Sequence, residues 1–435
     1  MPDPAIPAER STFAELAVRI AIAVATGWLL YEASCWLVPP IANVSGFGTD
    51  WQAMSADPFS FPGRLSHRIL GPLLAWLMGQ GGEGWLPFCG WLHVFMLAAV
   101  CFAALHLRAK PIDAILVTTL VAIAAPVQMY KLHWSGYTDP LCYGLFALSI
   151  VTARFPYVFW GLFLLNLGNH ELAGFLAPWL YYLRRREDGR WRLDLVLFGA
   201  ACALYLAYYL YVRSLAQQQF SIDYFVGHPL FPGGSFIVYN LASVHWVCAF
   251  GPMLALLGWH QHRKAAGSER WHLWLVLLGI AVIFAIAFDW ARHSNLILLP
   301  LLVAAVRFLE GGGWRSRTVV AALIGASLLV FWLQPPWSPS AVPTNLFLDG
   351  TPEWRAANNP EGLPLGFLVK NEIVLFGPAQ GGGLNVSFAS LGTVLERWLP
   401  TVWPLLLMLH GLGAAIWLFG WLLARFRSLS PPSAP

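Results

Sequence analysis

The sequence predicts an all-α, polytopic integral membrane protein: a single transmembrane domain over residues 1–435 with about 12 spanning helices. Of the 435 residues, 58% are hydrophobic and only 11% are charged, roughly half the charged fraction of a soluble domain. The 23 tryptophans suit two interfacial belts, because an indole ring can lie among acyl chains and still hydrogen-bond at the headgroups. The net charge of +4 gives no case for a nucleic-acid partner, so the lipid bilayer is the expected environment.

The predicted spans are the apolar segments between charged clusters, and a helix needs about 20 such residues to cross a bilayer. The first segment is too long for the apolar core of a signal peptide, so we expect a retained span. We place spans at residues 13–38, 84–107, 111–131, 138–154, 155–167, 170–184, 191–213, 236–259, 271–290, 294–308, 316–334 and 398–424.

Cationic clusters set the predicted orientation, because Lys and Arg are enriched in cytoplasmic loops. The clusters include Arg108/Lys110, Arg184/Arg185/Arg186, Arg263/Lys264, Arg307/Arg315/Arg317 and Arg425/Arg427. With these inside, both termini are cytoplasmic, and residues 39–65 and 334–397 form the first and last extracytoplasmic loops. His260, Gln261, His262 and His272 are then expected on a hydrated cytoplasmic surface.

Two segments depart from simple spans. Residues 155–183 begin and end at cytoplasmic charge but are too short for two full crossings, which predicts a broken hairpin interrupted at Gly168-Asn169-His170-Glu171. Residues 65–78 are apolar but short, and they predict an interfacial or re-entrant helix.

Ionisable side chains are the main functional candidates, because each costs several kcal/mol within a span unless it is paired or hydrated. Under the predicted topology, these residues and their polar neighbours gather at the outer ends of the spans. They are Asp50, Asp57, Arg64, His67, Arg68, Lys131, His133, Asp139, Asn169, His170, Glu171, Asp289, Arg292 and His293.

Each candidate also has a structural interpretation. Asp57-Pro58 and Asp139-Pro140 match helix N-termini, where a carboxylate caps free N–H groups and Pro occupies the first turn. Asn169 fits a helix cap, and Asp50 an ordinary loop acid. Asp289 and Arg292 are three residues apart and fit an ion pair on one helix.

Familiar soluble-enzyme motifs are absent from the sequence. There is no phosphate-binding glycine loop, HExxH or GxSxG. The six cysteines lie in apolar segments without CxxC spacing, so neither disulfides nor a thiolate metal site is expected.

A series of short motifs carries a family resemblance by its order along the chain. The motifs are Thr49-Asp50-Trp51, the stretch 64–72 (RLSHRILGP), Ser135-Gly136-Tyr137-Thr138-Asp139, Gly168-Asn169-His170-Glu171 and Asp289-Trp290-Ala291-Arg292. In this order they resemble the C-type superfamily of polytopic membrane glycosyltransferases (GT-C), in particular its bacterial members.

This resemblance implies a bacterial inner-membrane enzyme that transfers a sugar, with inversion, from a polyprenyl-phosphate donor to a glycan, lipid or protein acceptor at the extracytoplasmic face. The family's catalytic carboxylate maps onto Asp50, with Asp57 as the neighbouring candidate and Glu171 as a third. The base takes the acceptor proton. Arg292, Arg64, Arg68 and Lys131 are candidates to stabilise the leaving phosphate.

The remaining candidates, His67, His133, Asp139, Asn169, Asp289 and His293, are expected around the substrate. His170 and Glu171 could orient the sugar or contribute to a divalent-metal site, although two ligands do not define one and no metal ligand is assigned.

Two rival functions remain open. A transporter or flippase uses intramembrane charges along a translocation path and should place polar residues at mid-membrane and at the inner side too. A polymerase or ligase of lipid-linked glycans shares the outer-face lipid chemistry.

Overall fold

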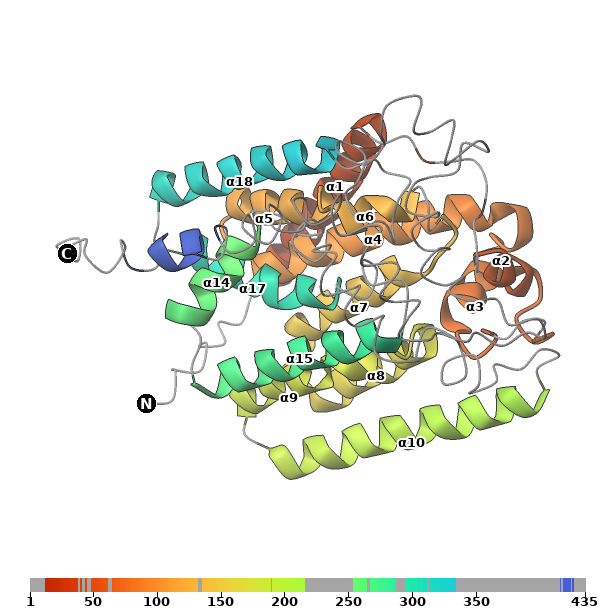
Figure 1. Cartoon of the computed structure of the whole chain (residues 1–435). Helices are drawn as coiled ribbons and strands as arrows, with labels where there is room; N and C mark the ends of the chain where they lie inside the picture. Colours follow the sequence, from red (N-terminus) through yellow and green to blue (C-terminus); the bar gives the residue numbers. More distant parts are fainter. Residues whose placement is uncertain are drawn as a thin grey trace, which may run out of the picture.

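The structure is a computed structural model that describes residues 12–37, 40, 44, 48–61, 65–131, 135–188, 190–215, 253–263, 267–286, 295–310 and 313–333, with scattered positions between 415 and 425. Within these ranges the chain is all-helical and has no strand (Figure 1). The predicted all-α class is therefore confirmed for the described residues.

The helices run roughly back and forth between two ends of one bundle (Figure 1). Their bounds are α1 (Phe13–Leu37), α2 (Gly48–Ala56), α3 (Leu70–Leu77), η1 (Gly82–Gly84), α4 (Trp85–His106), α5 (Pro111–Ala122), α6 (Ala125–Gln128), η2 (Met129–Lys131), α7 (Asp139–Thr152), α8 (Pro156–Asn169), α9 (Ala173–Asp188), α10 (Trp191–Leu215), α14 (Leu254–Arg263), α15 (Gly267–Ile286), η5 (Asn295–Ile297), α17 (Leu298–Leu309) and α18 (Gly313–Leu333).

Three segments among the described residues are long and apolar enough to cross a membrane: Phe13–Cys35, Gly82–His106 and Trp191–Leu215. The first and third expose most of their apolar side chains, such as Leu29 and Val196. Contiguous exposed apolar surface of this extent is typical of lipid contact. Some helices of the chain could thus span a membrane. The expected number of about 12 spans stays a prediction.

Helix α4 lies at the centre of the described bundle, packed between α1, α5 and α7. Gly27 lets α1 approach it closely, because a Cβ at this position would lie 2.7 Å from the backbone N of Ala98 and 2.9 Å from the backbone O of Val94. Small residues at such crossings allow backbones to pack tightly in membrane proteins.

The predicted span over residues 111–131 is wrong as a single helix. Helix α5 ends at Ala122, and the chain continues through the short helices α6 and η2. Pro126 gives the physical reason, since it has no N–H to donate and disfavours helical conformation in the residue before it.

The predicted interruption of the 155–183 hairpin is confirmed. Helix α8 has 14 residues and α9 has 16, about 21 and 24 Å, against a hydrocarbon core about 30 Å thick. Between them His170 is extended, with φ −160° and ψ 124°. The short helix expected within residues 65–78 is also present, as the eight residues of α3.

Ion pairs tie the helices together at the end opposite α2 and α3 (Figure 1). The Arg184 Nε lies 3.0 Å from Asp194 Oδ1, which also accepts a hydrogen bond from Trp160 Nε1 at 2.9 Å. Arg317 Nε donates to Asp113 Oδ1 at 2.6 Å, joining α18 to α5. The Arg184–Asp194 pair is fully buried, whereas the Arg317 side chain is 35% exposed, so charged groups lie inside this end of the bundle as well as at its rim.

The expectation of a hydrated surface is wrong for His260, which is buried. Its Nε2 lies 2.8 Å from Glu269 Oε1, while Glu269 Oε2 accepts hydrogen bonds from Tyr182 Oη at 3.0 Å and Arg307 Nη1 at 3.2 Å. The Glu269 network (Tyr182, His260, Glu269 and Arg307) therefore joins α9, α14, α15 and α17. Gln261 is buried beside His260 and corrects the same expectation.

Candidate functional site

Five ionisable side chains predicted as site residues meet near the end of the bundle formed by α2 and α3. They come from the loop before α3, the first turn of α7 and the break between α8 and α9. We call them the acid–base cluster: His67, Arg68, Asp139, His170 and Glu171.

Arg68 and Glu171 form the strongest pair of the cluster. The Arg68 Nε donates to Glu171 Oε2 at 2.8 Å, and Nη2 donates to Oε1, so the guanidinium grips both carboxylate oxygens. The Arg68 side chain is only 7% exposed, but that of Glu171 is 40% exposed. His67 Nε2 lies 3.5 Å from Glu171 Oε2. The carboxylate is thus held from the protein side and reached by solvent from the other.

His170 lies between two carboxylates in the break of the hairpin. Its Nδ1 accepts a hydrogen bond from the Leu172 N–H at 3.2 Å, so the neutral ring carries its proton on Nε2. That Nε2 is 3.9 Å from Asp139 Oδ1, and Nδ1 is 3.7 Å from Glu171 Oε2. Both His170 and Asp139 are buried. At 3.9 Å the His170 imidazole and the Asp139 carboxylate are too far apart for a hydrogen bond, so their contact is electrostatic and lies away from bulk water.

Asn169 holds the break between α8 and α9 in position through a hydrogen bond. Its Nδ2 donates to the backbone O of Thr138 at 3.0 Å, which ties the end of α8 to the start of α7. Gly71 of α3 packs against the same two residues, and a Cβ there would collide with the Thr138 side chain. The glycine therefore allows α3 to pack directly against Thr138 and Asn169, which flank the cluster.

Aromatic rings connect the acid–base cluster to α2. The Arg68 guanidinium lies 5.8 Å from the Trp51 ring centroid, and Trp51 packs edge-on against Tyr137 at 5.0 Å. Trp51 is the neighbour of Asp50, which lies half-buried in the first turn of α2. The predicted base thus belongs to the same end of the molecule as the cluster.

Asp57 stands apart as an exposed turn residue. Its carboxylate accepts a hydrogen bond from the Phe59 N–H at 3.2 Å, and the chain after it forms a turn, not a helix. The interpretation of Asp57-Pro58 as a helix N-terminus is therefore wrong. Asp139 does begin α7 with Pro140 in its first turn, but its carboxylate caps no N–H group of the helix, so that part of the interpretation is wrong.

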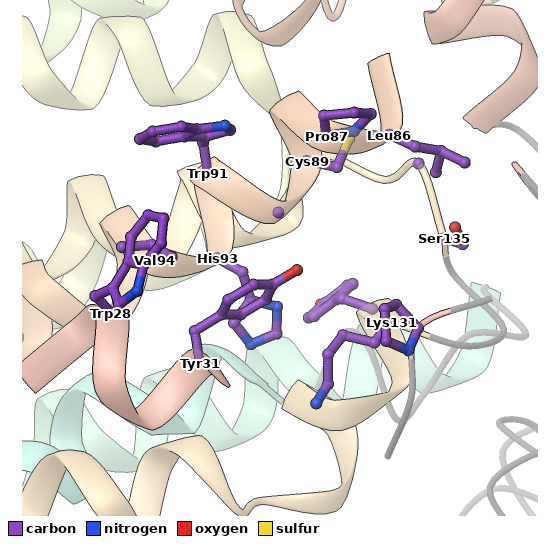
Figure 2. A pocket seen from close by; sticks show the side chains of 14 residues that line it. Trp28, Tyr31, Leu86, Pro87, Cys89, Trp91, His93, Val94, Lys131 and Ser135 are labelled. Carbon is purple, nitrogen blue, oxygen red and sulfur yellow. The ribbon is translucent and has the colours of Figure 1, made fainter. Parts of the chain in front are cut away.

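Lys131 lines a separate cavity of about 380 Å³ between α1, α4 and η2. In Figure 2, Tyr31, His93 and Lys131 gather in one part of this cavity, with Trp28 and Trp91 in another. His93 lies in the middle of an apolar span and was not among the residues predicted from the sequence. Its only signal was an ionisable side chain within a predicted span, which is itself unusual.

Ser135 and Gly136 line the cavity, and Asp139 belongs to the cluster, so one short segment borders both. The predicted residues Arg64, His133, Asp289, Arg292 and His293 lie outside the described residues. Within the described part of the chain, no three His, Cys, Asp or Glu side chains are grouped to hold a metal ion. Comparison of the chain with protein-family models, curated proteins and solved structures finds no match.

Proposed function

We propose that the protein is a membrane glycosyltransferase that moves a sugar from a polyprenyl-phosphate donor to an acceptor at the extracytoplasmic face. The observation that carries this proposal is the acid–base cluster, in which Arg68, Asp139, His170 and Glu171 from distant segments meet at one end of the bundle. Ionisable groups brought together within a membrane protein are functional-site candidates by default.

The proposed division of labour follows from which carboxylates are engaged. Arg68 binds both carboxylate oxygens of Glu171. Because this ion pair favours the ionised carboxylate, Glu171 is a poor proton acceptor and is better suited to orient Arg68 and His170. Asp50, half-buried on the first turn of α2, is proposed as the base that takes the acceptor hydroxyl proton. Arg292 is proposed to bind the leaving phosphate through its planar fork.

The proposed setting is a bacterial inner membrane with both termini in the cytoplasm. The support is the distribution of charge, since Arg184, Arg307 and Arg317 all belong to the end opposite the acid–base cluster. The positive-inside rule then assigns that end to the cytoplasm and the α2–α3 end to the outside.

One observation favours the rival transporter or flippase. Buried charges also occur at the end opposite α2 and α3, where a translocation path would need them. These charges are paired across neighbouring helices: Arg184 with Asp194, and Glu269 with His260 and Arg307. Closed pairs of this kind hold helices together, and they do not favour an open path for a solute.

The experiment is transfer of radiolabelled sugar from a polyprenyl-phosphate donor in proteoliposomes. Asp50→Asn keeps the shape of the side chain but removes the proton acceptor, so transfer should fall by roughly 10²–10⁴-fold with donor binding retained. The matched control is Glu83→Gln, which makes the same chemical change at an exposed position of η1 beside α2. This control should leave transfer unchanged.

Two results would redirect the proposal. Full transfer activity in Asp50→Asn would move the base to Asp57 or Glu171. Uptake or flipping of a lipid-linked glycan by the wild-type protein, without donor binding or transfer, would replace the transferase with the rival.

A further inference from the structure

Lys131 is a buried cation without a carboxylate partner among the described residues. Its side chain is 4% exposed, and its Nζ donates a hydrogen bond to Ser34 Oγ at 2.8 Å. The Ser34 hydroxyl in turn donates a hydrogen bond to the backbone O of Tyr31 at 2.7 Å, so this series of hydrogen bonds ends on a neutral acceptor. A buried ammonium needs a compensating negative charge, and a hydroxyl does not supply one.

His93 presents a second polar atom that lacks a partner within the described part of the chain. It is 2% exposed, and its Nε2 makes no hydrogen bond there. Its ring lies 5.5 Å from that of Tyr31, and both line the cavity that also holds Lys131 (Figure 2). Buried polar atoms are nearly always satisfied in native proteins, so an open one beside a cavity indicates a ligand.

The rest of the cavity is apolar and aromatic. Trp28 and Trp91 pack edge-on at 5.6 Å, and both are partly exposed on the outer surface of α1 and α4. Each of these helices is long and apolar enough to span a membrane. The volume of about 380 Å³ lies within the range of small-molecule sites. A ligand for this cavity needs one anionic group and an apolar body.

We propose that the cavity binds the anionic headgroup of a membrane amphiphile, held by Lys131 and His93, with the apolar part of the ligand against Trp28 and Trp91. The anion supplies the charge that Lys131 lacks, and one of its oxygens accepts a hydrogen bond from the Nε2–H of His93. A zwitterionic headgroup would bring a second cation toward Lys131. Lys131 is also among the cations expected to stabilise a leaving phosphate, but this proposal does not rest on sugar transfer, because it follows from the residues of the cavity alone.

Native mass spectrometry of the full chain in a non-ionic detergent tests the proposal with three probes: dioleoyl phosphatidic acid, dioleoyl phosphatidylcholine and inorganic phosphate. The acidic lipid should bind at least roughly tenfold more tightly than the zwitterionic one, as expected for a charge-assisted hydrogen bond. Inorganic phosphate should bind weakly, because it lacks the apolar body. Binding of phosphate as tight as that of the acidic lipid would overturn the assignment to a membrane amphiphile.

Variants locate the site. Lys131→Met keeps the length of the side chain and removes its charge, so the preference for the acidic lipid should disappear, and His93→Gln should weaken it. Lys110→Met makes the same change at an exposed position before α5 and should leave the preference intact. An undiminished preference in Lys131→Met would contradict the proposal.

A wild-type measurement keeps the test decisive if a variant fails to fold. A photoactivatable phosphatidic acid should crosslink to cavity residues of α1 and α4, and excess phosphatidic acid, but not phosphatidylcholine, should compete. Crosslinks confined to other helices would overturn the assignment. Because no sugar donor is present, this outcome is separate from success or failure of the transfer assay.

Discussion

At the scale of single residues, the two partners of the Arg68–Glu171 ion pair differ in how deeply they are buried. Arg68 is 7% exposed and Glu171 is 40% exposed, although they share two hydrogen bonds. Loss of the carboxylate would strand a buried guanidinium, whereas loss of the guanidinium would leave a carboxylate that water can reach. Arg68 therefore depends on its ion-pair partner for stability more than Glu171 does.

This inequality predicts that Glu171→Gln is more destabilising than Arg68→Met. The first should cost about 3 kcal/mol, as for a buried charge that loses its partner, and the second about 1 kcal/mol. Chemical unfolding in micelles, with the double variant to close the cycle, measures both. Glu83→Gln is the control for the same substitution at an exposed site. Equal costs for the two single variants would contradict the argument.

Sequence reasoning at this scale succeeded where a residue type was unusual for its surroundings. His67, Arg68, Asp139, His170 and Glu171 are polar residues at the ends of apolar segments, and they do meet in space. Spacing along the chain could not reveal that Lys131 belongs with Ser34 and His93 instead, because this contact spans 97 residues and depends on how α1 packs on α4.

At the scale of helices, close packing depends on glycines whose surroundings differ sharply. Gly27 of α1 faces the backbone of Ala98 and Val94, whereas nothing lies within 4 Å of a Cβ at Gly161 of α8. Both positions are helical, so the intrinsic preference for alanine over glycine is the same. A difference in stability between alanine variants at these two positions therefore measures the packing of α1 on α4.

Gly27→Ala should therefore destabilise the protein by about 1–3 kcal/mol, because rigid backbone atoms cannot move aside for the added methyl group. Gly161→Ala should be neutral or stabilising by up to about 1 kcal/mol. Thermal unfolding of both variants in the same detergent makes the comparison. A neutral Gly27→Ala would mean that α1 and α4 are farther apart than the structure has them.

The Glu269 network links four helices through one carboxylate and responds to pH. Burial alone would raise the pKa of Glu269, but the hydrogen bond and charge of His260, together with Arg307, lower it from 4.5 to about 2. A depressed pKa means that the folded state binds fewer protons than the unfolded state. Its stabilisation is complete above about pH 4.5 and is lost as the pH falls toward 2.

Unfolding free energies measured between pH 6 and pH 2 should therefore fall more steeply in the wild type than in Glu269→Gln, which has no proton to bind. The difference should be on the order of 2–3 kcal/mol, since one pKa unit corresponds to about 1.4 kcal/mol. Glu310→Gln provides the matched control at an exposed position after α17. Parallel pH profiles for wild type and Glu269→Gln would show that Glu269 is not coupled to folding.

At the scale of the whole molecule, composition and helix punctuation predicted the helical class, the break at His170 and the short helix α3. They could not predict the charged interior opposite α2 and α3. Charged side chains beside the predicted span boundaries were expected on a hydrated surface. Instead, Arg317 pairs with Asp113 across 204 residues, and the buried His260 pairs with Glu269. Such pairings depend on helix order in three dimensions, which the linear pattern does not contain.

The two ends of the bundle also give the topology a direct test. Glu83 in η1 is exposed near the α2–α3 end, and Lys110 is exposed near the opposite end, before α5. In a variant without the six native cysteines, a cysteine at position 83 should react with a membrane-impermeant maleimide in intact cells. A cysteine at position 110 should react only after the inner face is opened, because Arg108 and Lys110 belong to a cationic cluster that the positive-inside rule retains in the cytoplasm. A third cysteine at Gly382, in the predicted extracytoplasmic loop over residues 334–397, should behave like position 83. The reverse pattern at positions 83 and 110 would invert the protein in the membrane and bring the acid–base cluster to the cytoplasmic face, where an outer-face transferase could not operate.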